Sequence, residues 1–354
     1  FFVFSAIMFK HLKQDKLINQ LRANLSEVTL DQTEYDFIFP IFDRYRSRAD
    51  FIYQEGMLGW YNQEKEFLPV DECALHAPAL TEFIRTLGKR PIPIKKGSIR
   101  FRVNQAGLRG LWFDFANLDI KNLLSDFNFL DYFYENSIVI EVGQKGKRLE
   151  KIQGAYKLTD PRPEAWFETT YKDSQVPLAC LVSSFTQTNP QLNSQMIKII
   201  KSFLGQHRFS EIVEFGCGVG NFTLFLSEIT SRMVVIENDL RNLIPLRQNL
   251  QNHALGQQVS IFENLKHYFS SIKIDTNASA DKLYFVNPAR SGVGSLFDHP
   301  LGASQVVYVS CYMDSFLVDA IKLENQGFKL EKITLFDQFP HSEHFEIISL
   351  FKRT

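Results

Sequence analysis

The sequence predicts an α/β protein, in which an N-terminal α+β domain precedes a doubly wound, Rossmann-like domain. From about residue 184 onward, buried strand-like segments alternate with helical segments, which is the pattern of a parallel, doubly wound sheet. Residues 35–175 instead contain short strand-like segments separated by turns. We therefore expect an α+β domain over residues 1–183 and a doubly wound domain over residues 184–354.

The first half is expected to contain two clear helices among its strands. Residues 71–88, DECALHAPALTEFIRTLG, have helical periodicity and end at a glycine. Residues 10–26 also have helical periodicity, and their expected apolar face consists of Leu12, Ile18, Leu21 and Leu25.

The second half contains stronger boundary signals. Asn189 is a suitable N-cap, and Pro190 occupies the first position of a helix that ends at Gly205. The two final strand-like segments, FKLEKITLF (328–336) and HFEIISLFKR (344–353), are expected to form an antiparallel pair.

The composition is typical of a globular protein in a reducing compartment. Hydrophobic residues make up 45% of the chain and charged residues 22%. The four cysteines lie far apart and form no CxxC pair, so neither a disulfide framework nor a metal site is expected. The apolar stretch at residues 1–9 is too short to cross a bilayer, and a signal peptide would have its basic residues before the apolar run. We expect a cytoplasmic protein without a membrane partner.

Basic residues are clustered locally, although the net charge is −1. Three clusters lie in residues 43–50, 89–102 and 143–151. Each cluster is either a solvated face or part of a surface for a polyanion. The residues singled out are Lys95, Lys96 and three arginines at alternate positions, which a strand would place on one face: Arg44, Arg46 and Arg48.

A glycine loop lies between a buried strand and a helix, in EFGCGVGNF (214–222). Gly216, Gly218 and Gly220 allow a tight turn and a close approach of a ligand to the backbone. The spacing is GxGxG and not the GxGxxG of dinucleotide folds, and Glu237 ends the next strand, where a carboxylate can bind ribose hydroxyls. This combination favours S-adenosylmethionine, and the alternative is a tight turn with a surface glutamate.

Two further side chains are candidates for chemistry. Cys311 follows the apolar run 306–308, at the end of a predicted strand, where α/β proteins place ligand-binding groups. Glu346 lies among apolar residues in FEIISLF, where partial burial would raise its pKa toward that of a useful base. The alternatives are a packing cysteine and an outward-facing strand glutamate.

Ordered motifs along the chain resemble the uracil-5-methyltransferases of tRNA and 23S rRNA. YRSRADF (45–51) and the stretch around Cys73 resemble family segments in the first half. The second half matches in five places: SFTQTNPQLNSQM (184–196), GCGVGNF (216–222), FVNPARSGVG (285–294), YVSC (308–311) and FDQFPHSEHFEIISL (336–350).

This resemblance implies methyl transfer from S-adenosylmethionine to C5 of an RNA uridine that is flipped out or unpaired. It assigns Cys311 as the nucleophile that adds to C6 of uracil, and Glu346 as the base that removes the C5 proton. We expect Arg290 to favour the thiolate and, with the five basic residues above, to contact RNA. The cofactor positions implied are Gln187, Asn221, Glu237, Asn287 and the backbone of Gly216, Gly218 and Gly220.

The sequence departs from the family pattern at several positions. Tyr312-Met313 replaces Asn-Pro after the nucleophile, and Ala289 replaces the second proline of NPPR. Cys73 resembles the fourth ligand of an iron–sulfur cluster found in many relatives, but residues 2–4 lack the expected cysteine, so we predict no intact cluster. The alternatives are a base-amino methyltransferase and a non-catalytic RNA-binding protein that retains the fold. We expect a monomer.

Overall fold

The computed structural model forms two compact units. Unit 1 consists of Phe1–Ile41, Thr169–Val176 and Gln191–Thr354, and unit 2 of Phe42–Glu168 and Pro177–Pro190. The residues that the structure describes are 2–26, 30–40, 44–62, 64–70, 72–88, 92, 96–115, 119–143, 146–187, 189–271, 279–339 and 344–353.

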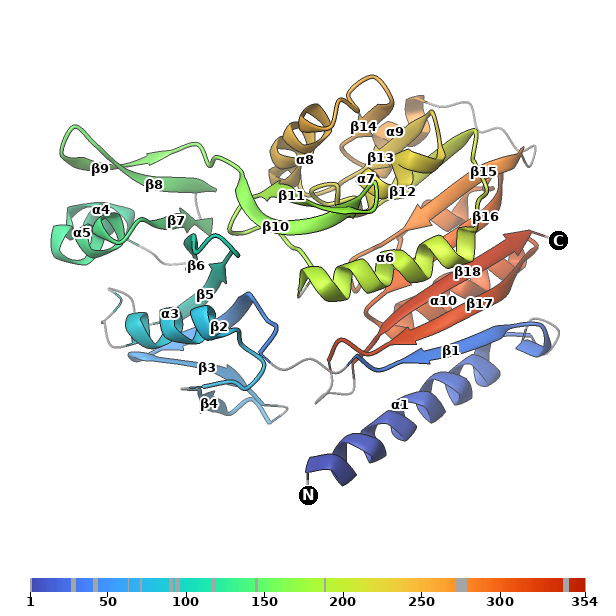
Figure 1. Cartoon of the computed structure of the whole chain (residues 1–354), viewed down its shortest axis with the longest axis horizontal. Coiled ribbons are helices and arrows are strands. Elements are labelled where there is room, and N and C mark those ends of the chain that lie inside the picture. Colours follow the sequence, from blue (N-terminus) through green and yellow to red (C-terminus); the bar gives the residue numbers. More distant parts are fainter. Residues whose placement is uncertain are drawn as a thin grey trace. The chain divides into compact units, whose positions relative to one another are not determined.

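Unit 1 is built on an eight-stranded sheet with the order β1-β17-β18-β16-β15-β12-β13-β14 (Figure 1). The pairs within this sheet are parallel, except that β18 is antiparallel to both β16 and β17. This is the expected doubly wound, Rossmann-like sheet, closed by the expected antiparallel pair. The strands are β1 (Glu34–Ile38), β12 (Glu211–Phe215), β13 (Met233–Ile236), β14 (Val259–Phe262), β15 (Ser279–Val286), β16 (Ala303–Ser310), β17 (Phe328–Phe336) and β18 (Glu346–Arg353).

Helices connect these strands, as the right-handed crossovers of a parallel sheet require. Pro190 begins the helix that leads into β12, as its fixed φ favours. The helices are α6 (Pro190–Leu204), α7 (Asn221–Leu226), α8 (Leu240–Asn252), α9 (Leu265–Ser271) and α10 (Met313–Asn325).

The first 41 residues belong to unit 1 and not to the α+β domain, so the predicted boundary at residue 183 differs from the observed division. β1 pairs in parallel with β17 and covers an edge that would otherwise expose unpaired backbone groups (Figure 1). Helix α1 (Phe2–Asn24) buries Leu17 and Leu21, together with Leu25 just after it, in the core of the same unit. The predicted apolar face was wrong at Leu12, which is 54% exposed.

Unit 2 contains a second eight-stranded sheet, with the order β4-β3-β2-β5-β6-β7-β8-β9. It is antiparallel except between β6 and β7. A hairpin of β10 (Glu164–Tyr171) and β11 (Ser174–Cys180) contributes residues to both units. The strands of the sheet are β2 (Arg48–Gln54), β3 (Met57–Tyr61), β4 (Phe67–Pro69), β5 (Lys96–Val103), β6 (Arg109–Asp114), β7 (Ile138–Val142), β8 (Lys147–Ile152) and β9 (Ala155–Thr159).

The helices of unit 2 include two that the sequence did not predict. The predicted one is α3 (Pro78–Gly88), which begins at Pro78 and not at residue 71, because a proline suits the first turn of a helix. The others are α4 (Ile120–Ser125) and α5 (Phe127–Glu135). The sequence of α5, FNFLDYFYE, is aromatic and has weak helix propensity. Its helix is stabilised by the side chain of Asp126, which caps the N-terminus, and by burial of Phe129, Leu130 and Phe133 in the unit 2 core.

Within the described residues, no helix has the length and apolar character needed to cross a membrane. Cys73, Cys180, Cys217 and Cys311 all carry free thiols.

Candidate active site

Cys311 and Glu346 lie together at one edge of the unit 1 sheet. β16 ends at Ser310, and in the antiparallel register Ser310 is opposite Ile347 of β18. One further step along this register places Cys311 opposite Glu346, the first residue of β18. The antiparallel direction of β18 therefore brings its beginning to the edge where the parallel strands end.

Glu346 is a buried acid with a raised pKa. Glu346 is 5% exposed, and this burial raises the pKa of its carboxyl to about 7. Nε2 of Gln338 donates a hydrogen bond to Oε1 of Glu346 at 2.7 Å, and this bond opposes the shift. The sequence did not single out Gln338, although it lies inside the FDQFPH motif. An acid with a pKa near 7 can exchange a proton at neutral pH.

Cys311 is half-buried, and its surroundings shift the pKa of its thiol in opposite directions. Burial, and then the charge of Glu346, raise the pKa of the Cys311 thiol. The guanidinium of Arg290 lowers this pKa through its charge and a hydrogen bond to the thiol. Arg290 therefore contacts Cys311 as expected, but the expectation that the site favours the thiolate is not met, because burial outweighs Arg290.

The loop that carries Arg290 is anchored by Asp319 of α10. Oδ2 of this buried carboxylate accepts hydrogen bonds from the Tyr308 hydroxyl at 2.6 Å and from Val293 N at 3.0 Å. Gly292 has φ +76°, and a Cβ there would lie 2.7 Å from Asp319 Oδ2. Asp319 was not predicted from the sequence, because its partners come together only through long-range packing.

The Tyr312-Met313 departure leaves the start of α10 in place. Met313 is the first helical residue, and Tyr312 is the N-cap in an extended conformation, without a side-chain capping bond. Oγ of Ser310 instead accepts a hydrogen bond from Tyr312 N at 3.1 Å. Tyr312 thus forms the turn that leads from Cys311 into α10.

The glycine loop is closely packed on one side and open on the other. A Cβ at Gly216 would lie 2.2 Å from the carbonyl oxygen of Asn287, whereas a Cβ at Gly218 would meet nothing within 4 Å. Both glycines have positive φ, as does Gly220. Glu237, just after β13, accepts hydrogen bonds from Gly218 N and Asp239 N, both at 2.7 Å. The hydrogen bond from Gly218 therefore joins the glycine loop to the Glu237 carboxylate.

Glu214 beneath this loop has a buried acceptor without a partner. Thr223 donates to its Oε2 at 2.6 Å, but Oε1 has no hydrogen-bond partner within the described residues. Burial, and then the charge of Glu237, raise the pKa of Glu214 to about 8. S-adenosylmethionine carries an ammonium group and two ribose hydroxyls, all of them donors. An unpaired acceptor beside Glu237 and an open Gly218 fit such a ligand.

Asn221 and Gln187, two of the three amide side chains predicted to bind cofactor, have different surroundings. Asn221 forms a reciprocal amide pair with Asn193 of α6, with N–O distances of 2.9 and 2.7 Å. This pair joins the start of α7 to α6, and the sequence did not single out Asn193. Gln187 is buried in unit 2.

The three arginines at alternate positions do not share one strand face, so this prediction was wrong. β2 begins only at Arg48, and Arg46 forms an isolated bridge with His76. Arg44 is exposed and has φ +51°, which is incompatible with a strand. Lys96 is exposed at the start of β5, and Lys95 lies outside the described residues.

Most basic side chains of unit 2 are bonded within the unit. Arg102 is 1% exposed, and its guanidinium donates to Leu181 O, Ser184 O and the Thr186 hydroxyl at 2.8–3.1 Å. Arg48 donates to Thr186 O at 3.0 Å. In the 143–151 cluster, three residues form ion pairs with acids: Lys147, Arg148 and Lys151. These groups stabilise the unit and contribute less charge to its surface than the sequence suggested.

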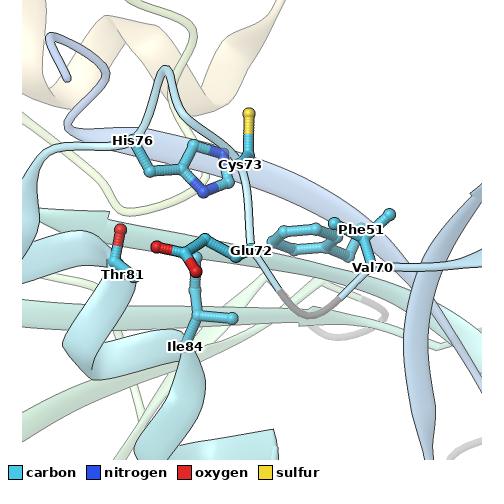
Figure 2. A pocket seen from close by; sticks show the side chains of 7 residues that line it. All are labelled: Phe51, Val70, Glu72, Cys73, His76, Thr81 and Ile84. Atoms are coloured by element: carbon cyan, nitrogen blue, oxygen red, sulfur yellow. The ribbon is translucent and has the colours of Figure 1, made fainter. Parts of the chain in front are cut away.

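Cys73 borders a small pocket in unit 2, shown in Figure 2. His76 N donates to Cys73 O at 3.0 Å, and burial, with the charge of Arg46, lowers the pKa of His76 to about 4. No group of three or more His, Cys, Asp or Glu side chains in the described part of the chain could hold a metal ion. The absence of an iron–sulfur cluster stays a prediction.

Comparisons with known proteins agree with the resemblance. The family model for tRNA (uracil-5-)-methyltransferase matches residues 170–354. An uncharacterized RNA methyltransferase of Bdellovibrio bacteriovorus is 32% identical over 321 residues, which are 87% of this chain and 81% of that protein. The 23S rRNA (uracil(1939)-C(5))-methyltransferase RlmD of Vibrio cholerae is 28% identical over 62% of this chain, and the match spans about half (48%) of that protein's length.

The fold is also found in a solved structure. The Pyrococcus abyssi tRNA (uracil-54, C5)-methyltransferase, crystallised with S-adenosyl-L-homocysteine, has a TM-score of 0.56. The match covers 95% of this chain and 83% of that one, at 17% identity. With the fold, the family model and the Bdellovibrio relative in agreement, the chain belongs to the tRNA (uracil-5-)-methyltransferase family, the S-adenosylmethionine-dependent enzymes that methylate C5 of uracil in RNA.

Proposed function

We propose that this protein methylates C5 of a uridine in rRNA or tRNA, with Cys311 as the nucleophile and Glu346 as the base. One observation carries the proposal: the register of β16 and β18 places a half-buried thiol opposite a buried carboxyl whose pKa is about 7. A reaction on the flat uracil ring needs a nucleophile for C6 and a base for the C5 proton near the same ring.

The first step belongs to Cys311. C5 of uracil is a weak nucleophile, and addition of the thiolate to C6 forms an S–C6 bond and makes the ring an enolate that is nucleophilic at C5. Arg290 supports the thiolate through its charge and hydrogen bond. S-adenosylmethionine, when bound, supplies the electrophilic methyl group. We propose that Glu237 and the glycine loop hold it, with Glu214, Asn221 and Asn287 of the same unit in support, and Gln187 remains a cofactor position that the family resemblance implies.

The last step belongs to Glu346. After methylation C5 carries both a proton and the methyl group, and the ring recovers its double bond only when the proton leaves. The Glu346 carboxylate takes this proton, the S–C6 bond breaks, and Cys311 is released as a thiolate. With a pKa of about 7, Glu346 is ionised in about half of the molecules at neutral pH.

We propose that unit 2 binds the RNA and that the target uridine is flipped out of its helix or loop. Arg44, Arg46 and Lys96 remain candidates for phosphate contacts. Arg48 is better explained as a structural residue, since it donates to Thr186 O. An RNA substrate and the free cysteines support a cytoplasmic enzyme, and we propose that it acts as a monomer.

Nucleoside mass spectrometry tests the activity. The native protein and the Cys311→Ala and Cys73→Ala variants are each incubated with S-adenosylmethionine and unmodified 23S rRNA or tRNA transcripts. We expect 5-methyluridine from the native protein and from Cys73→Ala, and none from Cys311→Ala. Tight binding of the cofactor without methylation of either RNA would refute the proposal in favour of a non-catalytic RNA-binding protein.

A further inference from the structure

Lys13 is a buried cation on α1 that the proposed chemistry does not use. The residue is 2% exposed, and its Nζ donates to Asp337 Oδ1 at 2.7 Å and to Phe339 O at 2.9 Å. A buried ammonium is unfavourable unless it is paired and hydrogen-bonded. Both of these acceptors belong to the short segment 337–339, which follows β17. Lys13 therefore fixes one particular piece of chain.

Two further hydrogen bonds hold the same segment. Asp337 N donates to the carbonyl oxygen of Ile38 at 2.9 Å, at the end of β1. Phe339 N donates to Asp337 Oδ1 at 3.0 Å, which closes a local turn. The residue inside this turn is Gln338, which is buried and donates to Oε1 of Glu346 at 2.7 Å. Two elements of the first 41 residues, α1 and β1, thus help to fix the turn that contains Gln338.

We propose that Lys13 is a positioning residue for the base Glu346, and that it acts through Asp337 and Gln338. This inference rests on the proposed role of Glu346 in removing the C5 proton. Lys13 does not touch the reacting atoms: it holds the turn that aims the amide of Gln338 at the Glu346 carboxyl. The N-terminal helix is therefore part of the catalytic apparatus of unit 1.

The position of Gln338 affects the protonation of Glu346. A hydrogen bond donated to a carboxylate favours the charged form, so loss of this bond raises the pKa. Cys311 is the titratable side chain that faces Glu346 from β16, and Arg290 contacts Cys311. His344 is exposed on the same segment as Glu346, and the charges of Lys13 and Asp337 offset each other.

The test is the pKa of Glu346 itself, measured in the full-length protein by ¹³C-carboxyl NMR of labelled glutamate, with Glu346→Gln to assign the resonance. We expect Lys13→Met and Gln338→Leu each to raise this pKa by about one unit, which would lower turnover at pH 7 about fivefold and leave turnover at pH 9 nearly unchanged. The double variant should show no further shift. Lys282→Met is the control, because it removes an ion pair with Glu211 at the start of β12.

A lower melting temperature for Lys13→Met with an unchanged Glu346 pKa would overturn the inference, as would additive shifts in the double variant. If Lys13→Met does not fold, Asp337→Asn replaces it: the amide oxygen still accepts from Phe339 N, but the partner charge of Lys13 is gone. A smaller upward shift supports the inference, and no shift overturns it. The titration needs no RNA, so its outcome is independent of whether the native protein forms 5-methyluridine.

Discussion

The two units bury charged side chains in different ways. Arg102 in unit 2 is surrounded by acceptors, including two backbone carbonyls and the Thr186 hydroxyl. Glu346 in unit 1 accepts a bond from Gln338, and Glu214 accepts one from Thr223 on a single oxygen. All three residues are at most 5% exposed. Within the described residues, the buried charge of Arg102 therefore has several hydrogen-bond partners, whereas the carboxyl groups of Glu346 and Glu214 each accept a side-chain bond on one oxygen.

This difference separates a structural role from a chemical one. A buried charge surrounded by hydrogen-bond partners holds chain segments in place and does not change its protonation near pH 7. A buried acid with few donors has a raised pKa and exchanges protons near neutral pH, which is typical of functional sites. The raised pKa values of Glu346, about 7, and Glu214, about 8, agree with the proposed role of this end of the unit 1 sheet.

The largest expected effect is on turnover in Glu346→Gln. The amide keeps the size of the side chain but cannot accept the C5 proton, so we expect turnover to fall about a thousandfold. Glu331→Gln is the matched control, because Glu331 forms a surface ion pair with Lys352. If both variants lost activity equally, Glu346 would have no special chemical role.

The next effect concerns stability in unit 2. Arg102→Met removes one donor each from Leu181 O, Ser184 O and the Thr186 hydroxyl in a buried site, so we expect the free energy of unfolding to fall by about 3 kcal/mol. Arg85→Met removes an exposed ion pair with Glu72 and should cost about 0.5 kcal/mol or less. Urea denaturation measures both variants. Equal losses would show that the buried arginine is not the structural residue proposed here.

A third effect is the pH dependence of stability in unit 1. Because the folded pKa of Glu346 is about 7 and its ordinary value is 4.5, this group stabilises the fold below pH 4.5, and the contribution is lost as pH rises through 7. Glu346→Gln removes this loss. The free energy of unfolding of Glu346→Gln, measured relative to that of the native protein, should therefore be about 2 kcal/mol higher at pH 8 than at pH 5. A gain that is independent of pH would show that the folded pKa is not raised.

The smallest effect is on the pH–rate profile of Arg290→Ala. Without the guanidinium, the pKa of Cys311 rises further, so the rate at pH 7 should fall about tenfold and recover as the pH is raised. Arg208→Ala, which removes an exposed hydrogen bond to Glu228 O, is the control. An unmoved profile in Arg290→Ala would exclude Arg290 as the group that supports the thiolate.

Local sequence patterns predicted the features that depend on residues close together in the sequence. The strand–glycine–helix pattern at 214–222 located the glycine loop, and the order of motifs selected Cys311 and Glu346 as candidates. Lys13 and Asp337 are separated by 324 positions, so their pairing depends on packing that no local pattern describes. Asp319 was missed for the same reason.

Two wrong predictions have specific physical causes. Alternation places arginines on one face only within a strand, and the chain enters β2 only at Arg48, after a left-handed Arg44. In α1 the buried leucines are Leu17 and Leu21, and the helix presents Leu12 to solvent. The face that α1 buries depends on its contact with α10 and on the ion pair of Lys13 with Asp337, both of which join segments far apart in the sequence.

The most direct test of the account is to isolate the covalent intermediate in Glu346→Gln. Without the base, methylation can proceed but the C5 proton stays, so the protein should remain bonded to C6 of a methylated uridine. After incubation with S-adenosylmethionine and RNA, the complex is digested with protease and nuclease and the peptide is mapped by mass spectrometry. The proposed mechanism predicts 5-methyluridine attached to the peptide that contains Cys311. An adduct on Cys73 or Cys217, or no adduct in a variant that binds both cofactor and RNA, would contradict it.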